Sequence, residues 1–299
     1  MLLALHAGPT SAAWAWANQI VAQAISNGWR VLERDETESK PAGGADWLLS
    51  SDGTNAAGEM DVLVLGPDFV AADLGRLDVV QLSERFQGQE MPSPDGTRWF
   101  AGAFVNAAKA AESSSRLRLV DAETAVIEVD GLVALKRPGD LGELRADDPA
   151  LGVYRRRLAS GGRAFWSAVL FAGGQGRSIS ATGWQDLTGR VMPVAADPAM
   201  SLISGQWSIE WLIEVDPEDG FVELLFQWGG EIFKKSIAQP GLYSVIQSAE
   251  LNSGGHMIAT ITSARPHFQG KARFSGALVT YLGALSQRVP TPEELQEGQ

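Results

Sequence analysis

Two tryptophans, Trp184 and Trp228, stand beside glycine at points where the apolar pattern of a predicted strand ends. Sugar rings present apolar C–H faces, and an exposed indole ring at the rim of a β-sandwich can hold them. Gln227, Glu231 and His267 carry the amide, carboxylate and imidazole groups that could bind sugar hydroxyls. These five residues are the candidate carbohydrate-binding site. The alternative, equally supported by the sequence, is that each ring closes the end of a hydrophobic core.

The sequence carries no specific catalytic motif. It contains no G-x-S-x-G elbow, no phosphate-binding glycine loop, no H-E-x-x-H pair and no cysteine. The three histidines, His6, His256 and His267, lie far apart without metal-ligand spacing. His6 and Asp68 each end or follow a predicted strand, where an α/β active site would lie, but polar residues commonly end strands. We therefore predict no catalytic residue, no metal and no cofactor, with a His6–Asp68 acid–base pair as the enzymatic alternative.

The amino-acid composition narrows the classes of molecule that the protein could bind. The chain has 299 residues, and its 36 acidic against 24 basic side chains give a formal net charge of −12. Such a surface repels nucleic acid and anionic lipid. No segment approaches the roughly 20 apolar residues of a membrane span, and the apolar run at residues 2–7 lacks the basic flank of a secretory signal. The expectation is a protein that folds in the cytoplasm of its producer, without nucleic acid and without membrane insertion.

The first hundred or so residues show the pattern of a small α/β domain. Helices are predicted where apolar residues recur three and four positions apart, and strands where short apolar runs are bounded by turn residues. The predicted strands are 2–7, 29–34 and 60–66, and the predicted helices are 12–26 and 98–112. The order strand, helix, strand, strand indicates a βαβ-type unit over residues 1–112.

The clearest strand pattern lies nearer the C-terminus, where every second residue of 206–216 is apolar. The apolar positions are Trp207, Ile209, Trp211, Ile213 and Val215. This period of two predicts one buried and one solvated face. Further strands separated by glycine and proline turns are predicted at 221–228, 231–238, 242–249, 256–262 and 276–282. Short strands in such a series predict an antiparallel β-sandwich of the jelly-roll kind.

The predicted fold class is therefore α+β with two domains, a small N-terminal α/β domain and a C-terminal antiparallel β-sandwich. The domain boundaries are expected at 1–112 for attachment or assembly, 113–170 for a β-hairpin connector, 171–285 for the sandwich and 286–299 for an acidic tail. Within the connector, residues 124–136 have a hairpin pattern, and 165–171 are predicted as a strand. The basic run 155–157 is expected on a solvated face, or alternatively as a contact for an acidic partner.

Several motifs in this region resemble a known family. Gly183-Trp184 precedes the strands, Pro240-Gly241-Leu-Tyr243 opens a late strand, and Phe268, Gly270, Leu278 and Val279 close the region. This pattern resembles the carbohydrate-binding-module-like jelly roll of spike and fibre proteins of bacteriophages and gene transfer agents. The usual acidic residue before the last strand is Ala277 here, which argues against transferring a metal site. The resemblance covers the last third of the chain.

The resemblance implies a structural component of a phage or gene-transfer-agent particle, such as a head spike or tail fibre. It would be a non-catalytic oligomer that contacts other particle proteins and copies of itself and binds cell-surface polysaccharide. Its expected location is the particle, assembled in the bacterial cytoplasm. Two alternatives remain open at the level of the sequence. One is a hydrolase that acts on capsule or cell-wall glycan through the N-terminal domain, and the other is an architectural particle protein with no ligand.

Overall fold

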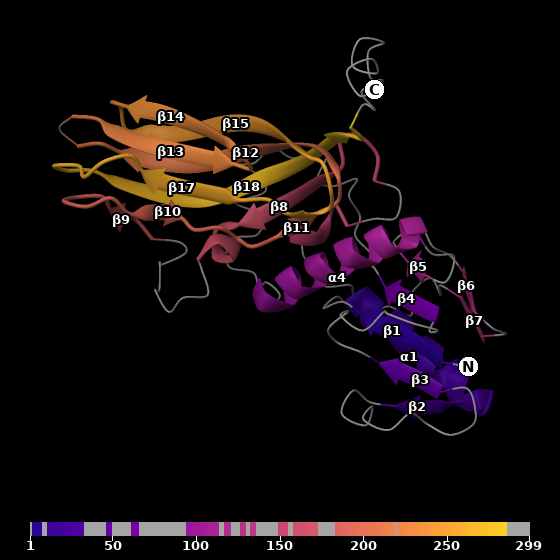
Figure 1. The fold of residues 1–299 in the computed structure, drawn as a ribbon. Coiled ribbons are helices and arrows are strands. Elements are labelled where there is room, and N and C mark those ends of the chain that lie inside the picture. Colours follow the sequence, from indigo (N-terminus) through magenta and orange to yellow (C-terminus); the bar gives the residue numbers. More distant parts are fainter. Residues whose placement is uncertain are drawn as a thin grey trace, which may run out of the picture.

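A computed structural model gives the fold of most of the chain. It describes residues 2–7, 11–32, 46–49, 61–65, 94–113, 117–120, 126–129, 132–135, 149–154, 158–172, 183–218 and 220–285. Asp68, the basic run 155–157 and the tail 286–299 lie outside these residues. The described chain has two parts, a parallel sheet with its helices and a larger antiparallel sandwich (Figure 1).

The N-terminal part is built on a five-stranded parallel sheet in the order β2-β3-β1-β4-β5. Its strands are β1 (Leu2–Ala7), β2 (Arg30–Leu32), β3 (Asp46–Leu49), β4 (Asp61–Leu65) and β5 (Leu117–Val120). The predicted strands at 2–7, 29–34 and 60–66 correspond to β1, β2 and β4, and the sheet contains two strands, β3 and β5, that the sequence analysis did not predict. The short apolar run Trp47-Leu48-Leu49 is the signal that marks β3.

Two helices accompany this sheet. Helix α1 (Ser11–Ser26) contacts β1, β2 and β4 and is followed by Gly28, whose φ of +78° suits glycine. Helix α4 (Pro94–Ser113) begins four residues earlier than predicted and contacts β5. The predicted hairpin is present as β6 (Val126–Val129) and β7 (Leu132–Leu135), which pair antiparallel.

The C-terminal part is an antiparallel sandwich of two main sheets. One sheet has the order β10-β17-β13-β14 and the other β15-β12-β18-β8, with β9 pairing with the start of β18. The strands are β8 (Arg163–Ser167), β9 (Gln185–Asp186), β10 (Pro193–Ala195), β12 (Gly205–Asp216), β13 (Val222–Trp228), β14 (Glu231–Ile237), β15 (Gly241–Leu251), β17 (Ala259–Ser263) and β18 (Lys271–Gly283). A small two-stranded sheet is formed by β11 (Ser201–Leu202) and β16 (Gly255–His256).

The alternating pattern of β12 gives the sandwich its core. Trp207, Ile209, Trp211, Ile213 and Val215 are all fully buried, as the period of two predicts. The opposing sheet contributes Leu224 and Phe226 of β13. Gln247 of β15 ties the two sheets together: it accepts a hydrogen bond from Trp211 Nε1 at 2.9 Å and donates to the carbonyl of Phe226 at 3.2 Å. A buried amide is satisfied in this way without leaving a polar atom unpaired.

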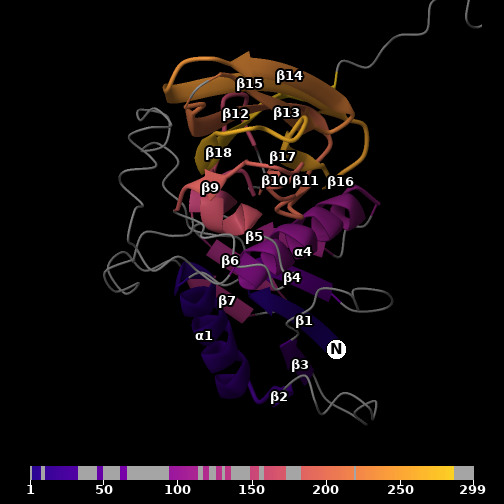
Figure 2. The same ribbon diagram turned by 90° about the vertical axis from the view of Figure 1, so that its left-hand side faces the viewer.

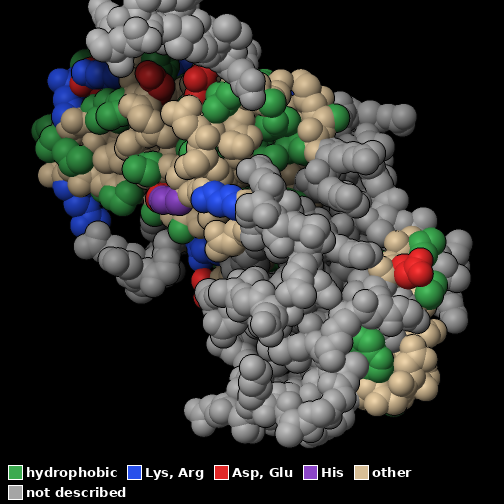
Figure 3. Space-filling model, turned by 45° about the vertical axis from the view of Figure 1, so that its right-hand side comes forward, with side chains coloured by type: hydrophobic (Ala, Val, Ile, Leu, Met, Phe, Trp, Pro, Cys, Tyr) green, Lys and Arg blue, Asp and Glu red, His purple; other side chains and the backbone are tan. Residues whose placement is uncertain are grey.

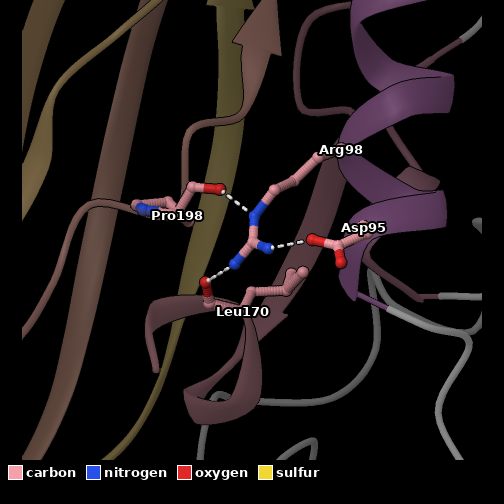
Figure 4. A network of polar contacts seen from close by, with 4 residues as sticks. All are labelled: Asp95, Arg98, Leu170 and Pro198. Atoms are coloured by element: carbon pink, nitrogen blue, oxygen red, sulfur yellow. Dashed lines mark hydrogen bonds and ion pairs between the residues drawn. The ribbon is translucent and has the colours of Figure 1, made fainter. Parts of the chain in front are cut away.

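Helix α4 contacts the sandwich as well as the parallel sheet. Phe100 and Phe104 pack edge-on against Tyr154, whose hydroxyl donates to the Ser201 carbonyl at 2.6 Å. Arg98 closes the same junction, since its guanidinium donates to the carbonyls of Pro198 (2.8 Å) and Leu170 (2.7 Å) and pairs with Asp95 (2.9 Å). Figure 4 shows this side chain reaching from α4 to two segments of the sandwich.

Two predictions in this region need correction. Residues 165–171 are predicted as one strand, but β8 ends at Ser167 and a 3-10 helix follows over Ala168–Phe171. This turn directs Leu170 and Phe171 into the core. In addition, β8 pairs with β18, so residues 163–167 belong to the sandwich although they fall within the expected connector.

Candidate functional site

The end of the sandwich farthest from α4 is formed by the β12–β13, β14–β15 and β17–β18 connections together with β9, and we call it the distal end. In Figures 1 and 2, α4 and the parallel sheet lie away from it. Trp184 precedes β9 and is 41% exposed, the largest exposed fraction among the tryptophans whose side chains the structure describes. Lys and Arg side chains gather at this end of the molecule (Figure 3).

Two cations lie over the Trp184 ring. Lys271 Nζ and the guanidinium carbon of Arg273 each lie 5.5 Å from the centre of the ring. Both residues belong to β18, whose first residues pair with β9, so the sheet itself sets the position of Trp184. A cation at this distance is attracted to the electron-rich face of an indole. The ring is thus held in place at the surface without being buried in the core.

Carboxylates surround the same cations. Lys271 Nζ lies 3.2 Å from Asp216 and 4.0 Å from Glu218, and Arg273 pairs with Glu214. The backbone N–H of Glu218 and the Lys271 ammonium hold the pKa of Asp216 below its ordinary value of 3.8. Asp186 of β9 has a lowered pKa through hydrogen bonds from Thr188. The Trp184 ring is therefore bordered by fixed hydrogen-bond donors and acceptors, the groups that bind sugar hydroxyls.

His267, another predicted site residue, lies in the β17–β18 connection at the distal end. It forms a bridge with Thr188, and its carbonyl accepts a hydrogen bond from Gly189 N–H at 2.8 Å. His267 is only 5% exposed. His267 therefore shapes the loop next to the Trp184 region, and its imidazole does not lie on the surface.

The prediction that Trp228 is a rim aromatic is wrong. Its side chain is fully buried and packs edge-on against Trp166 at a centroid distance of 6.1 Å. Trp228 is the last residue of β13 and has the same inward orientation as Phe226, two positions earlier. Its neighbour Gln227 faces the other side of the sheet, where its amide donates to the Gly229 carbonyl at 3.2 Å.

Glu231 lies in a groove of about 630 Å³ between the edge strands β14 and β15. The groove is lined by residues 230–233 and 246–250. It lies toward the β13–β14 turn, at the opposite end of β13 from the distal end. The structure therefore brings Trp184 and His267 to one end of the sandwich and Gln227, Trp228 and Glu231 to the other, so the five predicted residues do not form one site.

The distal end carries two further aromatic side chains that sequence reasoning missed. Phe221 is 45% exposed with Arg265 over its ring at 4.4 Å, and Phe268 is 90% exposed. Phe221 stands directly before β13, as Trp184 stands directly before β9, whereas Phe268 lies inside the β17–β18 connection. Together with Trp184 they give the distal end three exposed rings.

Two features bear on other kinds of site. Among the described residues, no group of three or more His, Asp and Glu side chains is arranged to hold a metal ion. No helix within the described ranges is long and apolar enough to cross a membrane.

His256 Nε2 lies 2.8 Å from Asp197, close to the junction with α4.

Comparisons with known proteins find solved structures that are similar to part of the chain. No protein-family model and no curated protein matches the chain. It is similar to the CBM22-1 xylan-binding domain of Paenibacillus barcinonensis Xyn10C, with 11% identity and a TM-score of 0.26 over 43% of this chain and 99% of that one. It is also similar to the CBM36-1 domain of a multidomain xylanase from the hindgut metagenome of Trinervitermes trinervoides, with 14% identity and a TM-score of 0.25 over 41% of this chain and 99% of that one.

A third similar structure is the carbohydrate-binding module CBM6cm-2 of Cellvibrio mixtus lichenase 5A in complex with cellotriose. It shows 14% identity and a TM-score of 0.21 over 39% of this chain and 95% of that one. The sandwich assignment for this chain rests on the strand pairing and burial described above.

Proposed function

We propose that the sandwich is a non-catalytic module that binds polysaccharide at its distal end, with Trp184 as the stacking surface. The observation that carries this proposal is the placement of Trp184, which is 41% exposed and has Lys271 and Arg273 over its ring. An apolar ring face bordered by paired donors and acceptors matches the two kinds of surface that a sugar presents.

The charge around the ring favours a neutral glycan. Lys271 and Arg273 supply two positive charges, whereas Glu214, Asp216 and Glu218 supply three negative ones. Each cation is already paired with a carboxylate, so an anionic polymer would have to displace that carboxylate. A neutral hydroxyl can instead bond to both members of a pair at once.

The test is binding of the full chain to soluble neutral polysaccharides, measured by affinity gel electrophoresis. Trp184→Ala should weaken binding roughly tenfold or more, corresponding to ~1.4 kcal/mol, while the melting temperature stays nearly unchanged. Trp184→Phe should retain part of the affinity, because a smaller ring still stacks. Ile258→Ala is the matched control, since Ile258 is 42% exposed but lies beside β17 at the opposite end. Unchanged binding by Trp184→Ala would contradict the proposal.

We further propose that the chain works as a component of a phage or gene-transfer-agent particle, where many copies bind a cell surface together. The sequence resemblance in the last third of the chain supports this assignment. Single sugar sites are weak, with dissociation constants near ~1 mM, and display of several copies raises the effective affinity by ~10²–10⁴. Immunolabelling of purified particles is the test, and the absence of the chain from particles that contain their other proteins would contradict it.

A further inference from the structure

Strand β14 is an open edge of the sandwich and is unusually apolar for an exposed edge. Within the described residues it pairs only with β13, so one side of its backbone has unpaired N–H and C=O groups. Ile232 is 62% exposed and Phe233 47% exposed, and Ile246 of the neighbouring edge strand β15 is 67% exposed. An open, apolar edge is a template for pairing with another strand.

The pairing with β13 fixes which β14 side chains share a face. Glu231, Phe233 and Lys235 lie opposite Trp228, Phe226 and Leu224. Those three β13 residues are fully buried, so the three β14 side chains are on the inward face of the sheet. Along that face the three side chains are acidic, aromatic and basic in turn, and they are spaced two residues apart.

We infer that β14 pairs antiparallel with β14 of a second copy of this chain, about a two-fold axis that passes through Phe233. In that register Phe233 lies opposite Phe233 of the copy, and Glu231 lies opposite Lys235 on both sides of the axis. Cross-strand pairs of opposite charge and of aromatic rings both stabilise antiparallel pairing. The order acidic, aromatic, basic is self-complementary only when the axis lies at its central residue, as an isologous contact requires.

Charged side chains on an edge strand often prevent pairing with another strand, and β14 carries two of them, Lys234 and Lys235. Lys234 is already paired with Glu223 at 2.7 Å, and Lys235 Nζ lies 5.4 Å from the centre of the Tyr243 ring. Neither lysine covers the apolar side chains beside it, because Ile232 and Phe233 stay exposed. A protective lysine repels a copy only where it meets another positive charge, and in this register Lys235 meets Glu231.

The position of the edge in the molecule leaves room for the copy. In Figures 1 and 2, β14 and β15 lie on the side of the sandwich turned away from α4 and the parallel sheet. The groove beside Glu231 and Phe233 opens along the same edge. The contact leaves the Trp184 region at the distal end uncovered, and the inference does not rest on glycan binding.

The first test exchanges charges in the full chain and measures the dimer dissociation constant by sedimentation equilibrium. Glu231→Lys brings two lysine side chains together twice per dimer, because the new lysine lies opposite Lys235, and Lys235→Glu likewise brings two glutamates together twice. Each single variant should weaken the dimer at least tenfold, and the double variant should restore it, because the exchange preserves complementarity. Tyr243→Phe is a control for the ring beside Lys235 and should leave the dimer unchanged. Failure of the double variant to recover would overturn the inference.

The second test uses the absence of cysteine from the chain, which makes any engineered thiol unique. Phe233→Cys should form a disulfide-linked dimer on oxidation, because the two thiols face each other across the axis. Lys235→Cys should not, since its two copies are about 14 Å apart along the ladder at ~3.4 Å per residue. A mixture of Glu231→Cys and Lys235→Cys chains should cross-link to each other. Cross-linking of Lys235→Cys with itself, or a wild-type chain that stays monomeric at ~1 mM, would overturn the inference.

Discussion

Trp211 belongs to a cluster of aromatic side chains in the sandwich core. It is fully buried, contacts Phe171, Phe226 and Phe274, and donates a hydrogen bond to Gln247. Trp211→Ala should lower the free energy of unfolding by ~3–5 kcal/mol, because it leaves a cavity and an unpaired buried amide oxygen. Trp211→Phe should cost ~1–3 kcal/mol, mostly through the unpaired oxygen.

Chemical denaturation of the full chain measures both changes. Trp184→Ala is the matched control for loss of an indole, and it should shift stability by no more than ~0.5 kcal/mol because its ring is at the surface. Equal losses for Trp184→Ala and Trp211→Ala would show that exposure does not separate the two tryptophans.

The tryptophans also show what residue-level reasoning can and cannot supply. The alternation along β12 predicted the burial of Trp207 and Trp211, and the structure confirms it. Trp228 was assigned to the rim because glycines follow it, although Val222, Leu224, Phe226 and Trp228 alternate in the same way. Whether a residue stands at an odd or an even position along a strand decides which face of the sheet its side chain occupies. A neighbouring turn decides only where the strand ends. Which site residues lie together depends on which strand ends meet in the fold. The spacing of residues along the chain does not show which ends these are.

At the scale of elements, β18 depends on a close approach to β8 at Gly276. This glycine has a φ of +143° at an irregularity in the pairing with β12, and an added Cβ would lie 2.8 Å from the Trp166 carbonyl and 2.7 Å from Phe165 Cζ. Gly276→Ala should therefore combine backbone strain of ~1–3 kcal/mol with overpacking of ~1–3 kcal/mol.

Gly283 provides the control for this substitution. Its φ is +149°, but no atom of the described residues lies within 4 Å of an added Cβ. Gly283→Ala should carry the backbone strain alone, so the difference between the two variants in thermal denaturation isolates the contact with β8. Equal destabilisation would mean that the approach of β8 to β18 is not tight.

The strands of the sandwich were predicted best where alternation and turn residues agreed, as in β12, β13 and β14. The segment predicted at 256–262 proved to be two strands, β16 and β17, which belong to different sheets. Strand β18 begins at Lys271, before the predicted 276, because Phe274 and Ala272 continue its buried face on the other side of the irregularity. At a register shift, the buried side chains change from odd to even positions or the reverse. The alternation of apolar residues therefore cannot be followed along the sequence past such a point.

At the scale of the molecule, the sandwich packs against segments that precede it in the chain, back to α4. Strand β8 buries Phe165 and Trp166, and α4 adds Phe100 and Phe104 around Tyr154. A fragment of residues 94–285 should unfold cooperatively, whereas residues 171–285 should not, because they lack β8 and expose its place beside β18. Circular dichroism and thermal denaturation of the two fragments measure this difference. A cooperative transition in the shorter fragment would restore the boundary expected at 171.

The order of strands in the sandwich has a consequence for synthesis of the chain. Strand β18 is the last described strand to leave the ribosome, yet it lies between β12 and β8 at the centre of its sheet. The parallel sheet can form early, since its strands all precede residue 121. Until β18 arrives, β8 has no neighbour in its sheet and β12 presents an open edge. The sandwich can therefore be completed only once β18 has been synthesised, and nascent chains are most prone to misassociation just before that strand appears.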